Sequence, residues 1–292
     1  MKILLIINPT AGTTKGKNAI FDILQMFCKA EYEVTCAVTQ HKGHATTLAK
    51  EAEGRFDMLV CCGGDGTLNE VITGIMQMEN KLPLGYIPAG TTNDFANSIG
   101  ITVDIKKAVK RIIDGEKVKI DMGKWNRKNF SYIASFGAFT AVSYKVPQTT
   151  KNIFGHMAYI FEGITDLGSL RPYHIKLESE ENTLEGEYIF GAISNSTSIG
   201  GIVKLDEKIV DMNDGFFEVA LIKFPKNAGE LNRIIWGIIN SDFKDSMFEF
   251  FKTSKVKITT EEKFDWSLDG EIAHGRREVV IENIKDAITI IK

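Results

Sequence analysis

A short apolar strand followed by a glycine turn and a helix most constrains what this chain folds into. Residues 57–62 form the kind of apolar run that a buried parallel strand shows, and Gly63-Gly64-Asp65-Gly66 follows directly. Backbone N–H groups at such a turn have no helical partner, and glycine lets a large anion approach the main chain. The turn therefore predicts a phosphate site, and Asp65 beside it indicates a bridging Mg²⁺ or water. One helical face then carries Leu68, Val71, Ile72, Ile75 and Met76.

The same residues also fit an ordinary strand-to-helix turn in which Asp65 caps the helix. The turn is not a Walker A loop, because no Gly-Lys-Ser/Thr follows it. It also lacks the Gly-x-Gly-x-x-Gly spacing of a dinucleotide-binding fingerprint. By itself the motif leaves the phosphate site and the structural turn open.

The first half of the chain alternates predicted strands and helices. This rhythm predicts a parallel sheet with helices on both faces and a ligand site at the carboxyl ends of the strands. Three loops leave such ends, namely residues 8–12, 63–67 and 88–94, so we expect them to meet. The expected strands are 3–7, 34–38, 57–62 and 84–87, and the expected helices are 20–27, 44–52, 68–76, 95–99 and 105–113.

The second half changes to short alternating segments, which predict a domain rich in antiparallel β structure. We expect an α/β domain over residues 1–124 and a β-rich, sandwich-like domain over 125–292. Residues 142–170 read as mainly helical or irregular, and a further helix is expected at 231–239. The expected strands are 117–124, 129–135, 174–178, 186–194, 216–222, 254–259, 264–268, 278–282 and 287–291.

Four motifs in order along nearly the whole chain resemble the diacylglycerol kinase catalytic-domain family, and more narrowly its small soluble bacterial lipid kinases. They are Asn8-Pro9-Thr10-Ala11-Gly12, Gly63-Gly64-Asp65-Gly66-Thr67-Leu68-Asn69-Glu70, Gly90-Thr91-Thr92-Asn93-Asp94-Phe95-Ala96 and Asp269-Gly270-Glu271. The resemblance implies two domains with the active site in the cleft between them, and a final segment that can return to the first domain. It also implies transfer of the γ-phosphate of ATP, with Mg²⁺, to a lipid hydroxyl.

The resemblance also assigns roles to individual residues. Asp65 would order the metal and its water, Asp121 would join that acidic network, and Glu271 would accept the proton of the lipid hydroxyl. Taken alone, Asp269-Gly270 is better interpreted as a hairpin turn, and helix capping is the alternative role of Asn93 or Asp94. The residues that would bind ATP are Asn8, Pro9, Thr10, Ala11, Gly12, Thr39, Gly63, Gly64, Asp65, Gly66, Thr67, Asn69, Glu70, Thr91, Asn93 and Asp94.

A second metal site is implied at the acidic turn Asp211-Met212-Asn213-Asp214-Gly215-Phe216. Carboxylate and carbonyl oxygens suit Mg²⁺, and relatives carry a structural magnesium in this region. The predicted ligands are Asp211, Asp214 and the carbonyl oxygen of Phe216. Asn213 stands where relatives often have a second aspartate, which lowers the negative charge of the turn.

Composition and charge fit a cytoplasmic enzyme. Hydrophobic residues make up 43% of the 292 residues and charged residues 25%, and a net charge of −3 gives no reason to expect a nucleic-acid partner. The apolar start of the chain stops at Asn8-Pro9, too soon for a signal peptide. The four cysteines show no C-x-x-C spacing, so we expect reduced core residues: Cys28, Cys36, Cys61 and Cys62.

The expected partner is a membrane lipid, by default diacylglycerol, met in transient contact with the inner membrane face; a homodimer stays open. Phosphatidylglycerol, a sphingoid base or another lipid alcohol is an alternative substrate. NAD kinase and 6-phosphofructokinase share the glycine turn, but residues 86–95 look like the lipid kinases. A lipid- or nucleotide-binding protein without turnover is an alternative of another class. Residues 152–170 are apolar enough either to cover a lipid or to form a core helix.

Overall fold

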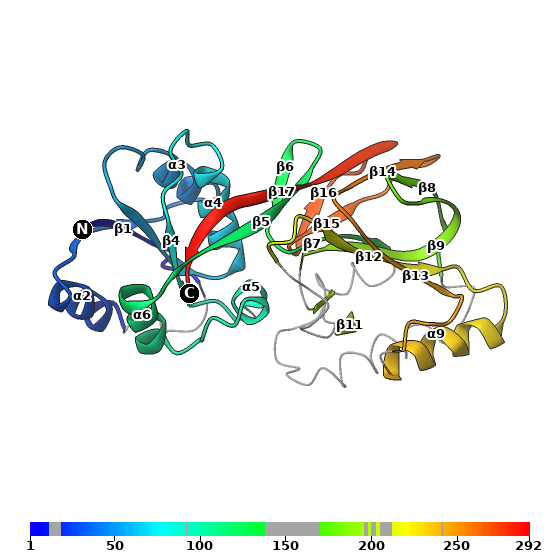
Figure 1. Cartoon of the computed structure of the whole chain (residues 1–292), viewed down its shortest axis with the longest axis horizontal. Helices are drawn as coiled ribbons and strands as arrows, with labels where there is room; N and C mark the ends of the chain where they lie inside the picture. The colour runs from blue at the N-terminus through cyan, green and yellow to red at the C-terminus, as the bar shows by residue number, and fades with distance from the viewer. Residues whose placement is uncertain are drawn as a thin grey trace. The chain divides into compact units, whose positions relative to one another are not determined.

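The chain folds into two compact units, shown in Figure 1. This computed structural model describes residues 1–11, 19–91, 93–137, 170–195, 198–199, 203–204, 212–240 and 242–292. The first unit comprises residues 1–121 and 285–292, and the second comprises residues 122–284. Two strands, β5 (Lys117–Trp125) and β17 (Glu278–Ile291), contribute residues to both units.

The first unit is built on a parallel sheet in the order β17-β4-β3-β1-β2. Strands β1, β3 and β4 read as continuous apolar runs, as expected for strands covered by helices on both faces, whereas the edge strand β2 is largely exposed. The strands are β1 (Lys2–Ile7), β2 (Glu33–Val38), β3 (Met58–Gly63) and β4 (Leu84–Pro88). The helices are α2 (Ile20–Lys29), α3 (His44–Lys50), α4 (Asp65–Ile75), α5 (Asp94–Ser98) and α6 (Ile105–Asp114).

Helices α2 and α6 cover one face of this sheet, while α3 packs beside α4 (Figure 1). Phe27 of α2 and Val109 of α6 are fully buried in a cluster with Ile3 and Leu5 of β1. Alternate residues of each strand point to opposite faces, so the remaining buried strand residues face the other side. The hydrophobic packing therefore fixes the sheet from which the strand-end loops project.

The second unit is antiparallel, and its central path runs β16-β15-β7-β9-β8-β14-β17. Strand β9 also pairs with β12, which pairs in turn with β13. Besides β5 and β17, the elements are β6 (Lys128–Phe130), β7 (Ile133–Gly137), β8 (Tyr173–Ser179), β9 (Thr183–Ser194), β10 (Ser198–Ile199), β11 (Val203–Lys204), β12 (Phe217–Lys223), α9 (Ala228–Asn240), β13 (Phe248–Thr253), β14 (Lys255–Thr260), β15 (Trp266–Leu268) and β16 (Glu271–Ala273).

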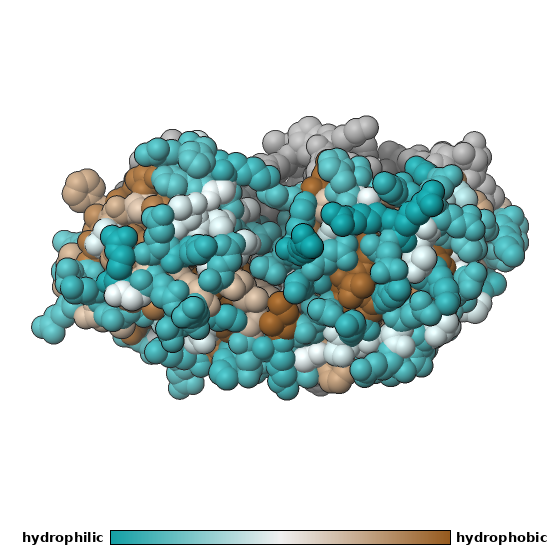
Figure 2. Space-filling model, turned by 90° about the horizontal axis from the view of Figure 1, so that it is seen from above, coloured by the Kyte–Doolittle hydropathy of each residue, from teal (hydrophilic) through white to brown (hydrophobic). Residues whose placement is uncertain are grey.

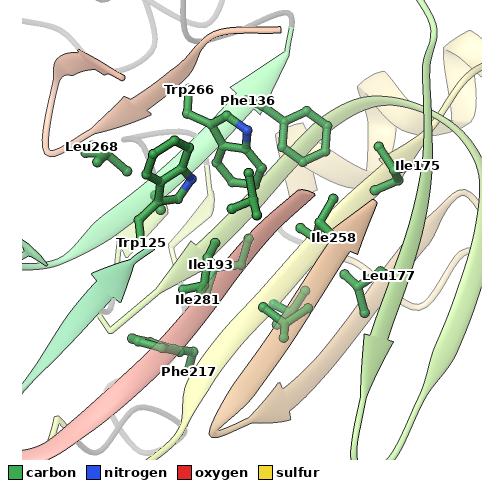
Figure 3. Packing of buried hydrophobic residues seen from close by; sticks show 14 of the residues in the cluster. Trp125, Phe136, Ile175, Leu177, Ile193, Phe217, Ile258, Trp266, Leu268 and Ile281 are labelled. Carbon is green, nitrogen blue, oxygen red and sulfur yellow. The ribbon is translucent and has the colours of Figure 1, made fainter. Parts of the chain in front are cut away.

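The core of the second unit is rich in aromatic rings (Figure 3). Trp266 lies next to Phe136, with ring centroids 4.9 Å apart, and 6.2 Å from Trp125. Ile258 and Ile281, from the paired strands β14 and β17, point into the same core. The strands of this unit thus surround one hydrophobic cluster, as the sequence pattern predicts for a sandwich-like domain.

Three predictions about local structure are wrong. The single strand expected at 129–135 is broken into β6 and β7, whereas the two strands expected at 278–282 and 287–291 form the continuous strand β17. Two cysteines expected in the core, Cys28 and Cys36, are exposed, while Cys61 and Cys62 are buried; all four are free thiols.

The face of the molecule shown in Figure 2 is mainly hydrophilic, with separate hydrophobic areas. Large hydrophobic side chains that are exposed include Phe21, Trp236 and Ile239. Among the described residues, no helix is long and apolar enough to cross a membrane.

Candidate active site

Three parallel strands of the first unit end side by side. Cys62 of β3 lies opposite Ile7 of β1 and Ile87 of β4 in the sheet register. The loops that follow remain bonded to these ends, because Asn8 N–H donates to the Cys62 carbonyl (3.1 Å) and Ala89 N–H to the Gly63 carbonyl (2.8 Å). The three loops predicted to meet therefore begin at one edge of the sheet.

Asn8 ties the first loop to the glycine turn. Its side-chain amide donates to Thr67 Oγ1 at 2.8 Å, and its Oδ1 accepts from the backbone N–H and the hydroxyl of Thr10 at 2.9 and 2.8 Å. The Thr67 side chain is buried at the start of α4. Asn8 and Thr67 therefore fix where the loop runs, and Thr10 lies exposed beyond them.

The turns after β3 and β4 pack main chain against main chain. A Cβ atom added to Gly90 would lie 2.6 Å from Gly64 Cα and 2.8 Å from Asn93 Oδ1. Asn93 and Gly90 also exchange two hydrogen bonds of 2.9 Å, between the side-chain amide of one and the main chain of the other. Gly66 differs, since it is exposed and a Cβ there would meet nothing within 4 Å.

We expect Gly90→Ala to lower the free energy of unfolding by roughly 1 to 3 kcal/mol, because the methyl group has no room against Gly64. Gly66→Ala, with open space at its Cβ, is the matched control and should unfold within about 0.5 kcal/mol of the wild type. Urea denaturation of the three proteins measures the difference. Equal stability of both variants would show that the two turns do not need this close approach.

Asp65 caps the short helix α5 from another loop. Its two carboxylate oxygens accept hydrogen bonds from the backbone N–H groups of Asp94 (3.1 Å) and Phe95 (3.2 Å). Asn93 stands at the cap position in a left-handed conformation, φ 51°, but its own side chain makes no capping bond. The Asn93 side chain therefore does not make the capping bond that the sequence analysis considered for it. The structure assigns that role to Asp65, which brings its carboxylate against the third loop.

Glu70 performs a similar task for α3. Its carboxylate accepts from the backbone N–H groups of Gly43 (2.7 Å) and Ala45 (3.1 Å), and its carbonyl accepts from Thr46 Oγ1 (2.9 Å). A carboxylate at a helix N-terminus is favoured by the unpaired N–H groups and the helix dipole. Glu70 is therefore a positioning residue in this structure.

Buried groups behind the glycine turn stay uncharged. Burial, together with the neighbouring Asp65 charge, raises the pKa values of Cys61 and Tyr86 well above their ordinary range. Burial raises the pKa of the Cys62 thiol to about 11. The Tyr86 hydroxyl donates to the Gly63 carbonyl at 3.3 Å. These thiols are thus poor nucleophiles, and the wall behind Asp65 is neutral at physiological pH.

Asp121 is also buried, with no exposed surface, and accepts a hydrogen bond of 2.7 Å from the backbone N–H of Asp286. Both residues belong to the first unit, in β5 and in the final segment of β17. The buried Asp121 carboxylate therefore links β5 to the C-terminal part of β17 within the first unit.

In the second unit, Asp269 and Gly270 form the two-residue loop of the hairpin between β15 and β16. Both have positive φ angles, 49° and 84°, as a type I′ turn requires. The Asp269 carboxylate accepts from the backbone N–H groups of Ser131, Tyr132 and Ile133. Glu271 follows the turn and is exposed. The hairpin alternative for Asp269-Gly270 is confirmed, and it leaves Glu271 accessible.

The ammonium group of Lys252, from β13, lies beside the acidic turn that precedes β12. Lys252 Nζ lies 2.9 Å from Asp214 Oδ2 and 3.2 Å from Glu218 Oε1. The other Asp214 oxygen accepts from Phe216 N–H at 2.9 Å, and the Phe216 carbonyl accepts from the Asn283 side chain at 3.1 Å. The two described candidate ligands are thus held by protein donors. No group of three or more His, Cys, Asp or Glu side chains suited to a metal occurs in the described part of the chain.

Glu218 is 1% exposed, and burial raises its pKa to about 7 although Lys252 opposes the change. The folded chain therefore retains a proton that the unfolded chain releases above its ordinary pKa of 4.5. The stability that this protonation contributes is complete below about pH 4.5 and is lost as the pH rises through 7.

We expect Glu218→Gln to remove this pH dependence. The free energy of unfolding of the wild type should fall, relative to the variant, by about 2 kcal/mol between pH 5 and pH 8. Chemical denaturation across this range measures it. The control is Glu249→Gln, which also changes a strand carboxylate paired with a lysine (2.7 Å from Lys223), and it should keep the wild-type slope. An unchanged slope in Glu218→Gln contradicts the assignment.

Two predicted site residues, Gly12 and Asp211, lie outside the described residues, as does the apolar segment 152–169. Thr39 is half-buried and follows β2, where its N–H donates to the Ile7 carbonyl at 2.9 Å. Thr91 and Asp94 are exposed on the third loop, and Asn69 is half-buried on α4.

Comparison with known proteins identifies the family. The family model for the diacylglycerol kinase catalytic domain matches residues 2–125. The diacylglycerol kinase of Bacillus subtilis (strain 168) is 37% identical over 270 residues, which cover 91% of this chain and 88% of the relative. The chain belongs to the diacylglycerol kinase family. It is therefore a lipid kinase.

Further relatives of this lipid kinase are also described as diacylglycerol kinases. A diacylglycerol kinase of Staphylococcus epidermidis is 34% identical over 271 residues, covering 91% of this chain and 84% of the relative. A crystal structure described as that of a diacylglycerol kinase from Bacillus anthracis str. Sterne is similar with a TM-score of 0.83 at 25% identity, covering 99% of this chain and 96% of that one. The two-part fold thus recurs within the family.

The sequence analysis of the kinase missed Glu218, Lys252 and Asn283. Glu218 and Lys252 lie directly opposite each other on β12 and β13, a cross-strand pair of opposite charges. If β13 had been predicted, the cross-strand pairing of Glu218 with Lys252 could have been found, but the sequence analysis predicted no strand there. No local signal marks Asn283, because its partner Phe216 is 67 residues away.

Proposed function

We propose that this lipid kinase transfers the γ-phosphate of ATP to the hydroxyl group of diacylglycerol, giving ADP and phosphatidic acid. The lipid oxygen forms a bond to the γ-phosphorus, the bond from that phosphorus to the β–γ bridging oxygen breaks, and a carboxylate takes the hydroxyl proton. The observation that carries the proposal is the meeting of three strand-end loops around the glycine turn that contains Asp65, where Asn8 bonds to Thr67 and the third loop bonds to Asp65.

The nucleotide phosphates would bind at the start of α4. The backbone N–H groups of its first turn favour anions, and the open space at Gly66 leaves room for a phosphate to approach the main chain. Asn8 and Thr67 hold the first loop against this turn. The other residues that we propose to line the nucleotide site are Pro9, Thr10, Ala11, Gly12, Thr39, Gly63, Gly64, Asn69, Thr91, Asn93 and Asp94.

Asp65 and Asp94 are the carboxylates that would hold Mg²⁺ with the nucleotide. Their side chains come from adjoining loops, because Asp65 Oδ2 lies 3.1 Å from Asp94 N. Carboxylate oxygens are hard ligands of the kind that Mg²⁺ prefers, so these two side chains would suit such an ion. When bound, Mg²⁺ supplies positive charge that neutralises the transferring phosphoryl group. The carboxylates of this chain hold and orient it.

At the turn containing Asp214 and Phe216, the described donors do not fit a metal ion. A metal ion there would have to displace the Lys252 ammonium, which lies 2.9 Å from Asp214 Oδ2 and 3.2 Å from Glu218 Oε1. Asp211 lies outside the described residues, so the proposal of a structural magnesium rests on the sequence resemblance. No step of the reaction depends on this ion.

Glu271 is the residue that we propose as general base. It is exposed, and it follows a turn whose backbone is fixed by both positive φ angles and the Asp269 carboxylate. An accessible carboxylate carried by a fixed backbone is suited to take a proton from a bound hydroxyl. Because the substrate is a membrane lipid and ATP a cytoplasmic nucleotide, we place the reaction at the cytoplasmic membrane face.

Transfer of ³²P from γ-labelled ATP to lipids in mixed micelles tests the proposed function. The panel contains diacylglycerol, phosphatidylglycerol and sphingosine, each with Mg²⁺ or with EDTA. We expect label in phosphatidic acid, lost with EDTA and kept in the control Glu185→Gln, which changes an exposed carboxylate of β9. Label in another lipid would keep the mechanism and change the substrate. Lipid binding by the folded protein without any transfer would overturn the kinase reaction proposed for these residues.

A further inference from the structure

An open pocket of about 540 Å³ lies in the first unit where the chain passes from α5 to α6. The chain reverses at Gly100, whose φ of 68° is left-handed, and the turn is closed by a bond of 2.8 Å from Ile101 N–H to the Ala96 carbonyl. The pocket is lined by Asn97, Gly100, Ile101, Thr102, Lys107 and Arg111.

Two cationic side chains, those of Lys107 and Arg111, line the pocket. Lys107 and Arg111 are four residues apart on α6, so they share one face of the helix. Arg111 Nη1 donates to the Gly100 carbonyl at 2.8 Å, which holds the guanidinium against the turn. Within the described part of the chain, neither Lys107 nor Arg111 forms an ion pair, whereas the neighbouring Lys106 pairs with Asp22 at 2.9 Å.

The carboxylate nearest in sequence is directed elsewhere. Asp104 caps α6 by accepting from the backbone N–H of Lys107 at 2.9 Å. Helix α6 carries four basic residues, Lys106, Lys107, Lys110 and Arg111, and one acidic residue, Asp114, in its last turn. Basic residues thus outnumber acidic ones on the helix that lines the pocket, and an anion would complete the charge balance.

The chemistry of the lining selects a phosphate group. A guanidinium presents a planar fork of donors and an ammonium presents a compact charge, and together they bind a tetrahedral anion from two directions. Thr102 adds a hydroxyl and Asn97 a side-chain amide on the same pocket wall. The volume exceeds that of one phosphate ion, so there is room for the alcohol esterified to it.

We propose that this pocket binds the phosphate group of a glycerol phosphate ester, supplied either by the headgroup of an anionic phospholipid or by a soluble ester. The site is separate from the strand-end loops and does not depend on the proposed kinase reaction. It bears on that reaction through α5, because the helix that ends beside the pocket begins at the N–H groups held by Asp65.

Binding of two probes to the full-length protein tests the proposal. One probe is sn-glycerol 3-phosphate, measured by calorimetry, and the other is phosphatidylcholine vesicles with or without phosphatidic acid, measured by flotation. Both are measured with excess ATP and Mg²⁺ present, so that other phosphate sites are filled. We expect Lys107→Ala to weaken phosphate-ester binding by roughly tenfold, as loss of a charge-assisted hydrogen bond predicts.

The matched control is Lys110→Ala, which removes the same charge from the same helix but outside the pocket lining. It should keep wild-type affinity for both probes. Arg111→Lys is a second test of the fork geometry and should also weaken binding, with thermal melting used to confirm that the turn at Gly100 is intact. Kinase activity on micelles is recorded in parallel, so that failure of the reaction and failure of the pocket give separate results.

Each outcome either supports or overturns the proposal, and the supporting outcomes also identify the source of the phosphate ester. Loss of vesicle binding alone in Lys107→Ala assigns the pocket to lipid headgroups, and loss of glycerol phosphate binding alone assigns it to a soluble ester. Loss of both shows that the phosphate ester is recognised from either source. Equal losses in Lys107→Ala and Lys110→Ala would show unspecific attraction to a basic helix, and unchanged binding in Lys107→Ala would show no site; either result overturns the proposal.

Discussion

Replacing Asp65 with asparagine is expected to lower kcat by about 10²- to 10³-fold, the usual cost of removing one charged group that stabilises a transition state. The reason lies in the two tasks that the structure gives this carboxylate. It holds the N–H groups of Asp94 and Phe95, and we propose that it also orients Mg²⁺ against the nucleotide. Asparagine keeps the shape and one accepting oxygen, but it removes the charge on which the second task depends.

Comparison with Asp65→Ala separates the two tasks. Alanine removes both acceptors of α5, so we expect it to lower the free energy of unfolding by about 1 to 2 kcal/mol, as loss of a helix cap does. Asn should lose less stability and nearly as much activity. Steady-state kinetics and urea denaturation of the two variants give both quantities. If Asp65→Asn kept most of its kcat as well as most of its stability, Asp65 would serve only as a helix cap, and the metal-orienting role would be overturned.

Local sequence patterns predicted the first unit well because its strands and helices obey them closely. Continuous apolar runs marked β1, β3 and β4, and helical spacing of apolar residues marked α4 and α6. Parallel strands in one sheet place their carboxyl ends together, so the shared edge of the three loops followed from strand order alone. Here each local preference agrees with the tertiary structure.

The second unit was harder because tertiary contacts override its local patterns. Strand β13, Phe248-Glu249-Phe250-Phe251-Lys252-Thr253, does not alternate cleanly, and no strand was predicted there. Strand β17 passes through Asn283, Lys285 and Asp286, polar residues between the two predicted strands, and it continues there because it belongs to both units. The break between β6 and β7 comes from Asp269, whose carboxylate takes the N–H groups of residues 131–133.

The candidate site was predictable as a set of residues but not as a set of roles. The motifs named Asp65, Glu70 and Asn93 together as nucleotide contacts. In the structure Glu70 holds α3, Asn93 holds Gly90, and Asp65 holds α5. The hydrogen bonds that the Asp65 and Glu70 carboxylates accept in these contacts join residues 25 or more positions apart, so spacing within a motif could not reveal them.

The hairpin at Asp269 and Glu271 provides the second large expected effect, because two carboxylates two residues apart have opposite roles. Asp269 accepts from three backbone N–H groups, and hydrogen bonds to a charged acceptor contribute more than neutral ones. Asparagine tolerates the positive φ of 49° as aspartate does, so Asp269→Asn leaves the turn backbone unstrained. It still offers one oxygen to three donors, and we expect it to lower the free energy of unfolding by roughly 2 to 4 kcal/mol.

Glu271→Gln should show the reverse pattern. Glutamine fits the exposed strand position, so the free energy of unfolding should stay within about 0.5 kcal/mol of the wild type. It cannot accept the hydroxyl proton, and loss of a general base lowers kcat by about 10²- to 10⁴-fold. Urea denaturation and kcat per folded molecule measure the two variants side by side. A Glu271→Gln protein that turns over normally would exclude Glu271 as the general base, whereas an Asp269→Asn protein as stable as the wild type would show that the Asp269 carboxylate does not stabilise the fold.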